Sequence, residues 1–289
     1  MPPTAPRCRR PGAARVGWTR RSLAVGGSST SLIAGKNRNE FSIDVWTIVL
    51  VLVAVLVGSS MQRVTGMGFA LVAAPFLVLL LGPIEGIVLI NACAVLTASV
   101  ILARVVREVD WRRYGVLAAW ALVGIIPGAL ILNVVSLAWL EISIGVMVAV
   151  GLGVSLSLRR VALKDRPVYR VIAGVLAGFM NTTAGVGGPA ASVYAVATHW
   201  PQRSFAATMQ PFFLTLGAAS LLAKFATGAA ITPNLSGTVL LLIAAACLIG
   251  LVVGELLSRV VEPHIARRML IVVAFVGAVA TIIRGLTEL

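Results

Sequence analysis

Two short polar stretches interrupt apolar sequence and hold the residues best suited to chemistry. One reads NTTAGVGGP over residues 181–189, and the other reads QRVTGMG over residues 62–68. Amide and hydroxyl side chains hydrogen-bond a solute without adding a charge, and glycines let a solute approach backbone N–H groups closely. Glycine and proline also disfavour a helix interior, by about 1 and 3 kcal/mol relative to alanine. Each stretch therefore predicts a helix end, an unwound loop and a new helix N-terminus.

The chemistry expected at such breaks is the binding of a small anion. A helix N-terminus carries about half a positive charge and several free N–H donors. Pro189 suits the first turn of the new helix, where an N–H would have no partner anyway. Two further amides, Asn91 and Gln210, correspond to each other in an internal repeat and extend the site. The candidate substrate-binding residues are Gln62, Arg63, Thr65, Gly66, Gly68, Asn91, Asn181, Thr182, Thr183, Gly185, Gly187, Gly188, Pro189 and Gln210.

Helix packing is the competing interpretation of the glycines, because small residues let membrane helices approach closely. The break recurs, however, and a short apolar segment follows it both times, which favours a binding or gating role. Arg63 either supplies a fixed positive charge to the anion site or extends to the membrane interface. Other ionisable residues are expected to lie at the interface or to pair locally: Glu85, Glu141, Lys224 and His199 at segment ends, and Glu255 with Arg259 four residues away.

The elements that must position these residues are membrane helices. Of the 289 residues, 59% are hydrophobic and 12% are charged, which is a membrane-protein composition. A bilayer core needs about 20 helical residues to cross, and apolar runs of that order repeat along the chain. The predicted fold is an all-α, polytopic helical bundle. Its ten predicted segments are 44–64, 69–82, 86–103, 114–133, 140–158, 171–184, 188–200, 204–222, 237–257 and 268–284. The second and seventh are too short to cross upright.

An internal repeat organises these segments into two halves. The sequence from Val55 aligns with the sequence from Val175, with a one-residue gap before the glycines, so that Gly68 meets Gly187. Further along, the segment from Gly124 to Gly128 meets the segment from Gly250 to Gly254. The predicted parts are a first repeat over 44–158, a basic linker over 159–170 and a second repeat over 171–289. Five crossings per half would invert the second repeat relative to the first, as in many secondary transporters, and the two breaks are expected to meet near the membrane midplane.

The net charge of +14 is concentrated in a few places. Basic residues cluster in the connections 104–113, 159–170 and 259–268, which the positive-inside rule assigns to the cytoplasm, rather than to nucleic-acid binding. Both termini and the other two connections, 134–139 and 224–236, then face outward. The predicted location is the inner cell membrane.

The basic N-terminal tail, residues 1–43, has a disordered composition rich in Arg, Gly, Pro and Ser. It resembles a transit peptide in composition, and an artefact of an upstream start codon accounts for it equally well. No function is assigned to it.

No enzymatic constellation is recognisable in the sequence. It contains no nucleotide-binding P-loop, no His and Cys set spaced for a metal, and no paired nucleophile and base. We therefore expect neither catalysis nor a cofactor. Cys93 and Cys247 are expected to be small packing residues. Transport energy would come from a coupling ion, H⁺ or Na⁺, or from the gradient of the solute itself.

Three stretches carry a resemblance to a known family. They are GSSMQRVTGMGFALVAAPFLVLL, AGFMNTTAGVGGPAASVYA and FAATMQPFFLTLGAASLLAKFATG. With the two-halved layout, they resemble the sulfite exporter TauE/SafE family of membrane transporters over residues 44–286. The resemblance implies gradient-driven export or uptake of sulfur-containing oxyanions and organosulfonates, such as sulfite or sulfoacetate, at the two glycine breaks. Phe69 stands where the second break has Gly188, so the resemblance does not imply equal contributions from the two halves.

The sequence thus predicts a secondary transporter that binds a small sulfur-containing anion within the bilayer. Two alternatives remain open at this stage. A non-transporting membrane scaffold or assembly protein would need the breaks only for partner recognition. A channel-like anion pore would use the same residues to line an open path.

Overall fold

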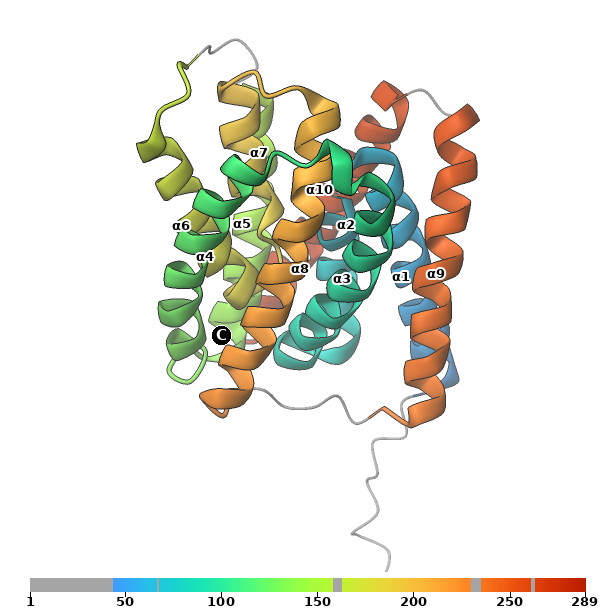
Figure 1. Ribbon diagram of the computed structural model, residues 1–289. Helices are drawn as coiled ribbons and strands as arrows, with labels where there is room; N and C mark the ends of the chain where they lie inside the picture. The colour runs from blue at the N-terminus through green and yellow to red at the C-terminus, as the bar shows by residue number, and fades with distance from the viewer. Residues whose placement is uncertain (1–43, 67, 158–162, 230–234, 261–262) are drawn as a thin grey trace, which may run out of the picture. The chain divides into compact units, whose positions relative to one another are not determined.

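The structure is a computed structural model that describes residues 44–66, 68–157, 163–229, 235–260 and 263–289 (Figure 1). In these residues the chain forms ten α-helices and one short 3₁₀ helix. The basic tail over 1–43 and the disorder predicted for it lie outside the described residues, as do residues 159–162 of the predicted linker. The elements are α1 (Val45–Thr65), α2 (Gly68–Leu81), α3 (Pro83–Val105), η1 (Val106–Glu108), α4 (Trp111–Ile131), α5 (Leu137–Ser157), α6 (Pro167–Ala184), α7 (Gly188–Ala197), α8 (Gln202–Ala226), α9 (Gly237–Val260) and α10 (Pro263–Thr287).

These helices confirm the predicted all-α membrane bundle. Seven of those described, α1, α3, α4, α5, α8, α9 and α10, are long and apolar enough to cross a membrane. The two segments predicted to be too short are α2, with 14 residues, and α7, with 10. Large apolar side chains such as Leu241, Val272 and Ile126 are exposed, whereas amides such as Gln62 and Asn181 are buried. This inside-out distribution suits a lipid environment.

The connections sort into two ends of the bundle, as the charge pattern predicts. Figure 1 shows η1, the start of α6 and the end of α9 at one end, together with the starts of α4, α8 and α10. The connection between α4 and α5, the end of α8 and the starts of α1 and α9 lie at the opposite end. We call the first the basic end, because the basic connection 104–113 and residues 163–170 of the basic linker lie there.

Helix pairing is symmetric with respect to the two predicted repeats. Helix α1 packs against α9 and α4 against α6, while α3 packs against α8 and α5 against α10. If each helix is replaced by its counterpart in the other repeat, α1 by α6 and so on, the same four pairs result. The pairing agrees with two related halves, and the division at 44–158 and 171–289 stays a prediction. The halves are not separate bodies, because residues 43–289 form one compact unit.

The glycines that match in the repeat occupy matching contacts. A Cβ on Gly124 would lie 2.0 Å from the carbonyl oxygen of Val175, so α4 packs with its backbone against α6. A Cβ on its counterpart Gly250 would lie 2.6 Å from the carbonyl oxygen of Leu56, so α9 packs in the same way against α1. Small residues at such crossings let two membrane helices pack closely. Each of the two broken helices is thereby held by a helix of the other half.

Candidate functional site

Both predicted breaks are helix ends capped by a left-handed glycine. Gly66 ends α1 with φ of 85°, and its N–H donates to the carbonyl oxygen of Gln62 at 2.8 Å. Gly185 ends α6 with φ of 70°, and its N–H donates to the carbonyl oxygen of Asn181 at 2.9 Å. Glycine adopts this conformation without the strain that a Cβ would cause. Gln62 and Asn181 therefore hold corresponding places, four residues before each capping glycine.

The short helices begin directly after the breaks. Helix α2 starts at Gly68, and α7 starts at Gly188 with Pro189 in its first turn, as predicted. Gly187 is the N-cap residue of α7 and fits tightly, since a Cβ there would lie 2.7 Å from Leu216 Cδ2 and 2.9 Å from a backbone oxygen of α6. Any larger residue would push the start of α7 away from α6 and α8.

The first amide cluster consists of Gln62, Thr97, Gln210 and the carbonyl of Gly66. Gln62 Nε2 donates to Gln210 Oε1 at 3.3 Å, and Thr97 Oγ1 donates to Gln62 Oε1 at 2.9 Å. Gln210 Nε2 donates to the carbonyl oxygen of Gly66 at 3.0 Å. The three side chains are buried. The cluster thus ties the end of α1 to α3 and α8.

The second amide cluster consists of Asn91, Asn181, Thr182 and Ser220. Asn181 Nδ2 donates to Asn91 Oδ1 at 2.9 Å and to Ser220 Oγ at 3.0 Å. The hydroxyls of Thr182 and Ser220 share a hydrogen bond of 3.0 Å. This cluster ties the end of α6 to α3 and α8, and it is the counterpart of the first. Sequence analysis missed Thr97 and Ser220, and the only signal for either was a hydroxyl side chain within a long, mainly apolar segment.

The two clusters lie at different levels of the bundle. Gln210 and Ser220 are both on α8, and the rise of an α-helix separates them by about 15 Å along its axis. The breaks were expected to meet at one place near the membrane midplane. In the structure, each break instead has its own cluster of amides, with the first cluster nearer to the basic end. Helices α3 and α8 connect them.

Three of the candidate side chains, Thr183, Thr65 and Arg63, have hydrogen bonds to residues outside the two clusters. Thr183 Oγ1 donates to the carbonyl oxygen of Phe179 at 2.8 Å, within its own helix, and Thr65 Oγ1 donates likewise to Met61 at 2.8 Å. Arg63 Nε donates to Glu255 Oε2 at 2.6 Å across the α1 and α9 contact. Glu255 therefore pairs mainly with Arg63, because Arg259 is 3.8 Å away and more exposed. The charge of Arg63 is neutralised by a partner that sequence analysis did not assign.

Two residues expected at the membrane interface are buried instead. The side chains of Lys224 and Glu141 are both 1% exposed. The prediction placed them at segment ends, but α8 continues to Ala226 and α5 begins at Leu137, so both residues lie inside helices. Glu141 lies 3.7 Å from Arg284 of α10, which supplies a partial partner. His199 is exposed as predicted, in a turn with φ of 51°.

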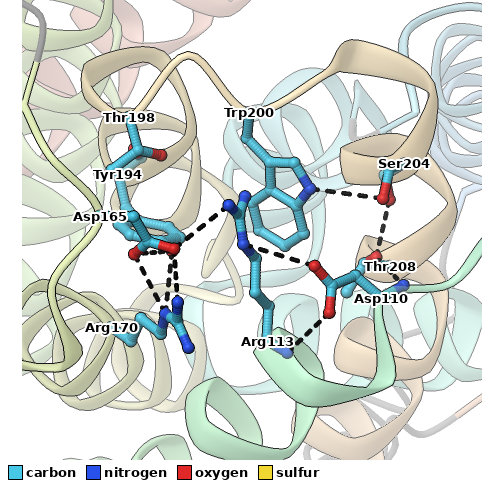
Figure 2. A network of polar contacts seen from close by, with 9 residues as sticks. All are labelled: Asp110, Arg113, Asp165, Arg170, Tyr194, Thr198, Trp200, Ser204 and Thr208. Carbon is cyan, nitrogen blue, oxygen red and sulfur yellow. Dashed lines mark hydrogen bonds and ion pairs between the residues drawn. The ribbon is translucent and has the colours of Figure 1, made fainter.

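A network of ionic contacts lies at the basic end beside α7 (Figure 2). Asp165, just before α6, accepts hydrogen bonds from Arg170 Nε at 3.1 Å and from the Tyr194 hydroxyl at 2.8 Å. Arg113 of α4 reaches the same carboxylate at 3.2 Å and lies 4.6 Å from the ring centroid of Trp200. Asp165 is outside the membrane-spanning segments, and the Arg170 guanidinium holds the pKa of its carboxyl below the usual range. The network joins α4, α6 and α7 at the point where the second broken pair meets the basic end.

A comparison with known families matches these elements as one unit. The family model described as Sulfite exporter TauE/SafE matches residues 50–281. The chain belongs to the sulfite exporter TauE/SafE family. The match runs from α1 to α10 and includes both breaks and both amide clusters. Membership of this TauE/SafE family, with the seven long apolar helices, identifies a multi-pass membrane transport protein. No curated protein and no solved structure matches the chain.

Proposed function

We propose that this TauE/SafE protein is a secondary transporter of small sulfur-containing anions, such as sulfite or organosulfonates, and that the two amide clusters bind the anion. The observation that carries the proposal is the burial of Gln62, Gln210, Asn91 and Asn181 in a mainly apolar interior. Burying amides in a membrane protein is costly unless hydrogen bonds satisfy them. Their amide N–H donors suit the oxygens of a sulfur oxyanion, and they fix no negative charge that would repel it.

The symmetric pairing supports transport by alternating access. Each broken pair, α1 with α2 and α6 with α7, packs against helices of the other half. A rocking motion of one half against the other would open one cluster to its own side while closing the second. The ionic network around Asp165 would then close the basic end, which we assign to the cytoplasm of the inner cell membrane. A coupling ion, H⁺ or Na⁺, would supply the energy.

Uptake into proteoliposomes tests the proposal. Purified protein is reconstituted, and the uptake of ³⁵S-labelled sulfite, thiosulfate and methanesulfonate is measured against external concentration, with and without an imposed H⁺ or Na⁺ gradient. We expect saturable uptake. Asn181→Ala should weaken it by raising KM, because Asn181 Nδ2 makes two buried hydrogen bonds within the second cluster. Asn133→Ala is the matched control, since Asn133 is exposed at the end of α4.

The same measurement separates the two alternatives. A channel-like pore would give uptake that rises linearly with concentration and ignores counter-substrate. A scaffold or assembly protein would give no uptake, and Asn181→Ala would change partner recovery instead. Absence of flux for every sulfur anion, with folding confirmed by size-exclusion chromatography, contradicts the proposed function.

A further inference from the structure

Among the described residues, three buried side-chain nitrogens lack a hydrogen-bond partner, and two of them lie outside the ionic network of Arg113. These two are the ammonium nitrogen Nζ of Lys224 and the amide nitrogen Nδ2 of Asn91. Lys224 is 1% exposed and Asn91 is fully buried. The other ionic contacts described in the bundle pair arginines with acids, such as Arg63 with Glu255 and Arg284 with Glu141. Among the described residues, no acid lies within ion-pair distance of Lys224.

Asn91 is a member of the second amide cluster, and Lys224 lies on α8 one turn beyond another member, Ser220. Asn91 joins the cluster through Asn181. Lys224 is on the buried face of α8 that also includes Gly217. Side chains of a helix slant toward its N-terminus, so we expect the stem of Lys224 to extend toward the turn of Ser220. A Cβ on Gly217 would lie 3.0 Å from the carbonyl oxygen of Asn91, so Asn91 adjoins the same face of α8.

The first cluster shows why Asn91 has a spare donor. Gln210 occupies the corresponding place there, and its Nε2 reaches the carbonyl oxygen of the capping glycine, Gly66, at 3.0 Å. Asn91 is one methylene shorter, and the described structure gives its Nδ2 no such contact with Gly185. Asn181 is likewise shorter than its counterpart Gln62. The longer side chains therefore close the first cluster on itself, whereas the second has shorter side chains and an unused donor.

We propose that Lys224 supplies the positive charge of the substrate site and Asn91 a neutral hydrogen-bond donor, beside the second amide cluster, and that together they select a singly charged anion. This inference rests on the proposed function and names its substrate class. An ammonium is a compact point charge that forms strong, charge-assisted hydrogen bonds with oxyanions. A buried charge is stabilised when its site becomes neutral overall. An anion with one negative charge neutralises the ammonium of Lys224, whereas an anion with two leaves an excess negative charge. Hydrogensulfite and alkanesulfonates fit this class, whereas sulfate and neutral sulfones do not.

Ligand-dependent thermal unfolding of the purified full chain tests the inference. Methanesulfonate is the probe, sulfate is the dianion and dimethyl sulfone is the neutral isostere. We expect methanesulfonate to raise the Tm, and to do so at lower concentration than sulfate or the sulfone. Lys224→Met should weaken methanesulfonate binding roughly tenfold to a hundredfold, the range for loss of a hydrogen bond to a charged group. Lys164→Met, at an exposed lysine outside the bundle core, should leave affinity unchanged.

A second variant keeps the test decisive if Lys224→Met folds poorly. Asn91→Gln restores the length found at Gln210, so its amide should reach Gly185 and close the second cluster. We expect it to fold, to raise the Tm without ligand and to bind methanesulfonate at least roughly tenfold more weakly. Unchanged affinity in both folded variants would overturn the inference. So would equal preference of the unaltered protein for methanesulfonate and dimethyl sulfone.

Failure of the inference can be told apart from failure of the proposed function. If Lys224→Met and Asn91→Gln both transport labelled methanesulfonate with unchanged KM, the inference is wrong and the proposed function stands. If the unaltered protein transports no sulfur anion, the proposed function is wrong. The site is then probed with nitrate and formate, and Lys224-dependent stabilisation by either would support a monoanion site, whereas its absence would overturn one.

Discussion

Replacing Gly66 by alanine should disable the first break, by an amount that the structure allows us to estimate. A left-handed backbone costs a non-glycine residue about 1–2 kcal/mol. The new Cβ would also lie 2.5 Å from the Cβ of Ala206, and neither atom is the end of a flexible side chain. Such overpacking costs about 1–3 kcal/mol. Gly66→Ala should therefore lower the free energy of unfolding by about 2–5 kcal/mol, or displace α8 by several tenths of an ångström.

Two other left-handed glycines calibrate this estimate. Gly228 has φ of 70°, and a Cβ at this position would have no neighbouring atom within 4 Å, so Gly228→Ala should show the backbone cost alone. Gly185 also has φ of 70°, and the nearest neighbour of a Cβ there would be the flexible side chain of Ile90 at 3.2 Å. The order of destabilisation should be Gly66→Ala first, Gly185→Ala second and Gly228→Ala third. Thermal and denaturant unfolding in one detergent, with transport measured in parallel, gives that order.

A double-mutant cycle isolates the clash. Ala206→Gly removes the Cβ that Gly66→Ala would meet and leaves the Cα of residue 206 at 3.1 Å. The double variant should be more stable, by about 1–3 kcal/mol, than the sum of the two single changes predicts, because the clash is removed. The cost of the left-handed backbone at residue 66 remains. Strict additivity of the two changes would refute the proposed clash. So would a Gly66→Ala variant no less stable than Gly228→Ala.

Three further predictions follow from the polar contacts. Gln210→Leu should lower the free energy of unfolding by about 1–3 kcal/mol, because the Gly66 carbonyl and Gln62 lose a buried hydrogen-bond partner. Denaturant unfolding measures this loss. An unchanged unfolding midpoint would count against the first cluster. The double variant in which Arg63 and Glu255 exchange places should recover about 1 kcal/mol of the stability that Arg63→Glu and Glu255→Arg remove singly. The substrate KM should not change. Full additivity of the two single changes would contradict the pairing of these residues. The pKa of Asp165 is lower in the folded protein than in the unfolded chain, where it is about 3.9. The charged carboxylate therefore stabilises the fold at pH values above about 3.9. This stabilisation disappears as the pH falls through the lower pKa of the folded state. The Tm difference between the protein and Asp165→Asn should therefore be largest near neutral pH and shrink below about pH 4, and a constant difference would refute the linkage.

The local features of the sequence predicted the helices and their interruptions well. Membrane spans depend on runs of apolar residues, and the ends at Gly66 and Gly185 depend on a backbone conformation that favours glycine. Both properties belong to short stretches of chain. The short helices after the breaks and the matching glycines of α4 and α9 were accessible for the same reason.

Contacts between distant segments were not accessible in this way. Arg63 and Glu255 are 192 positions apart, so sequence spacing instead suggested that Glu255 pairs with Arg259. Lys224 was placed at the interface because it stands near the end of an apolar run, although packing of neighbouring helices buries it. The division of the amides into two clusters depends on the antiparallel packing of α3 and α8, which no local pattern specifies. A single site near the midplane was the simpler expectation.

Counterflow in proteoliposomes tests most directly whether the two clusters work as one alternating transporter. Vesicles loaded with concentrated unlabelled sulfite are diluted into a trace of ³⁵S-labelled sulfite, with the membrane potential clamped at zero. We expect a transient accumulation of label inside the vesicles above its external concentration, because a carrier returns occupied more often than empty. We expect a smaller overshoot for Asn181→Ala and an unaltered one for Asn133→Ala. Simple equilibration of label without an overshoot, or no uptake at all, would contradict the account.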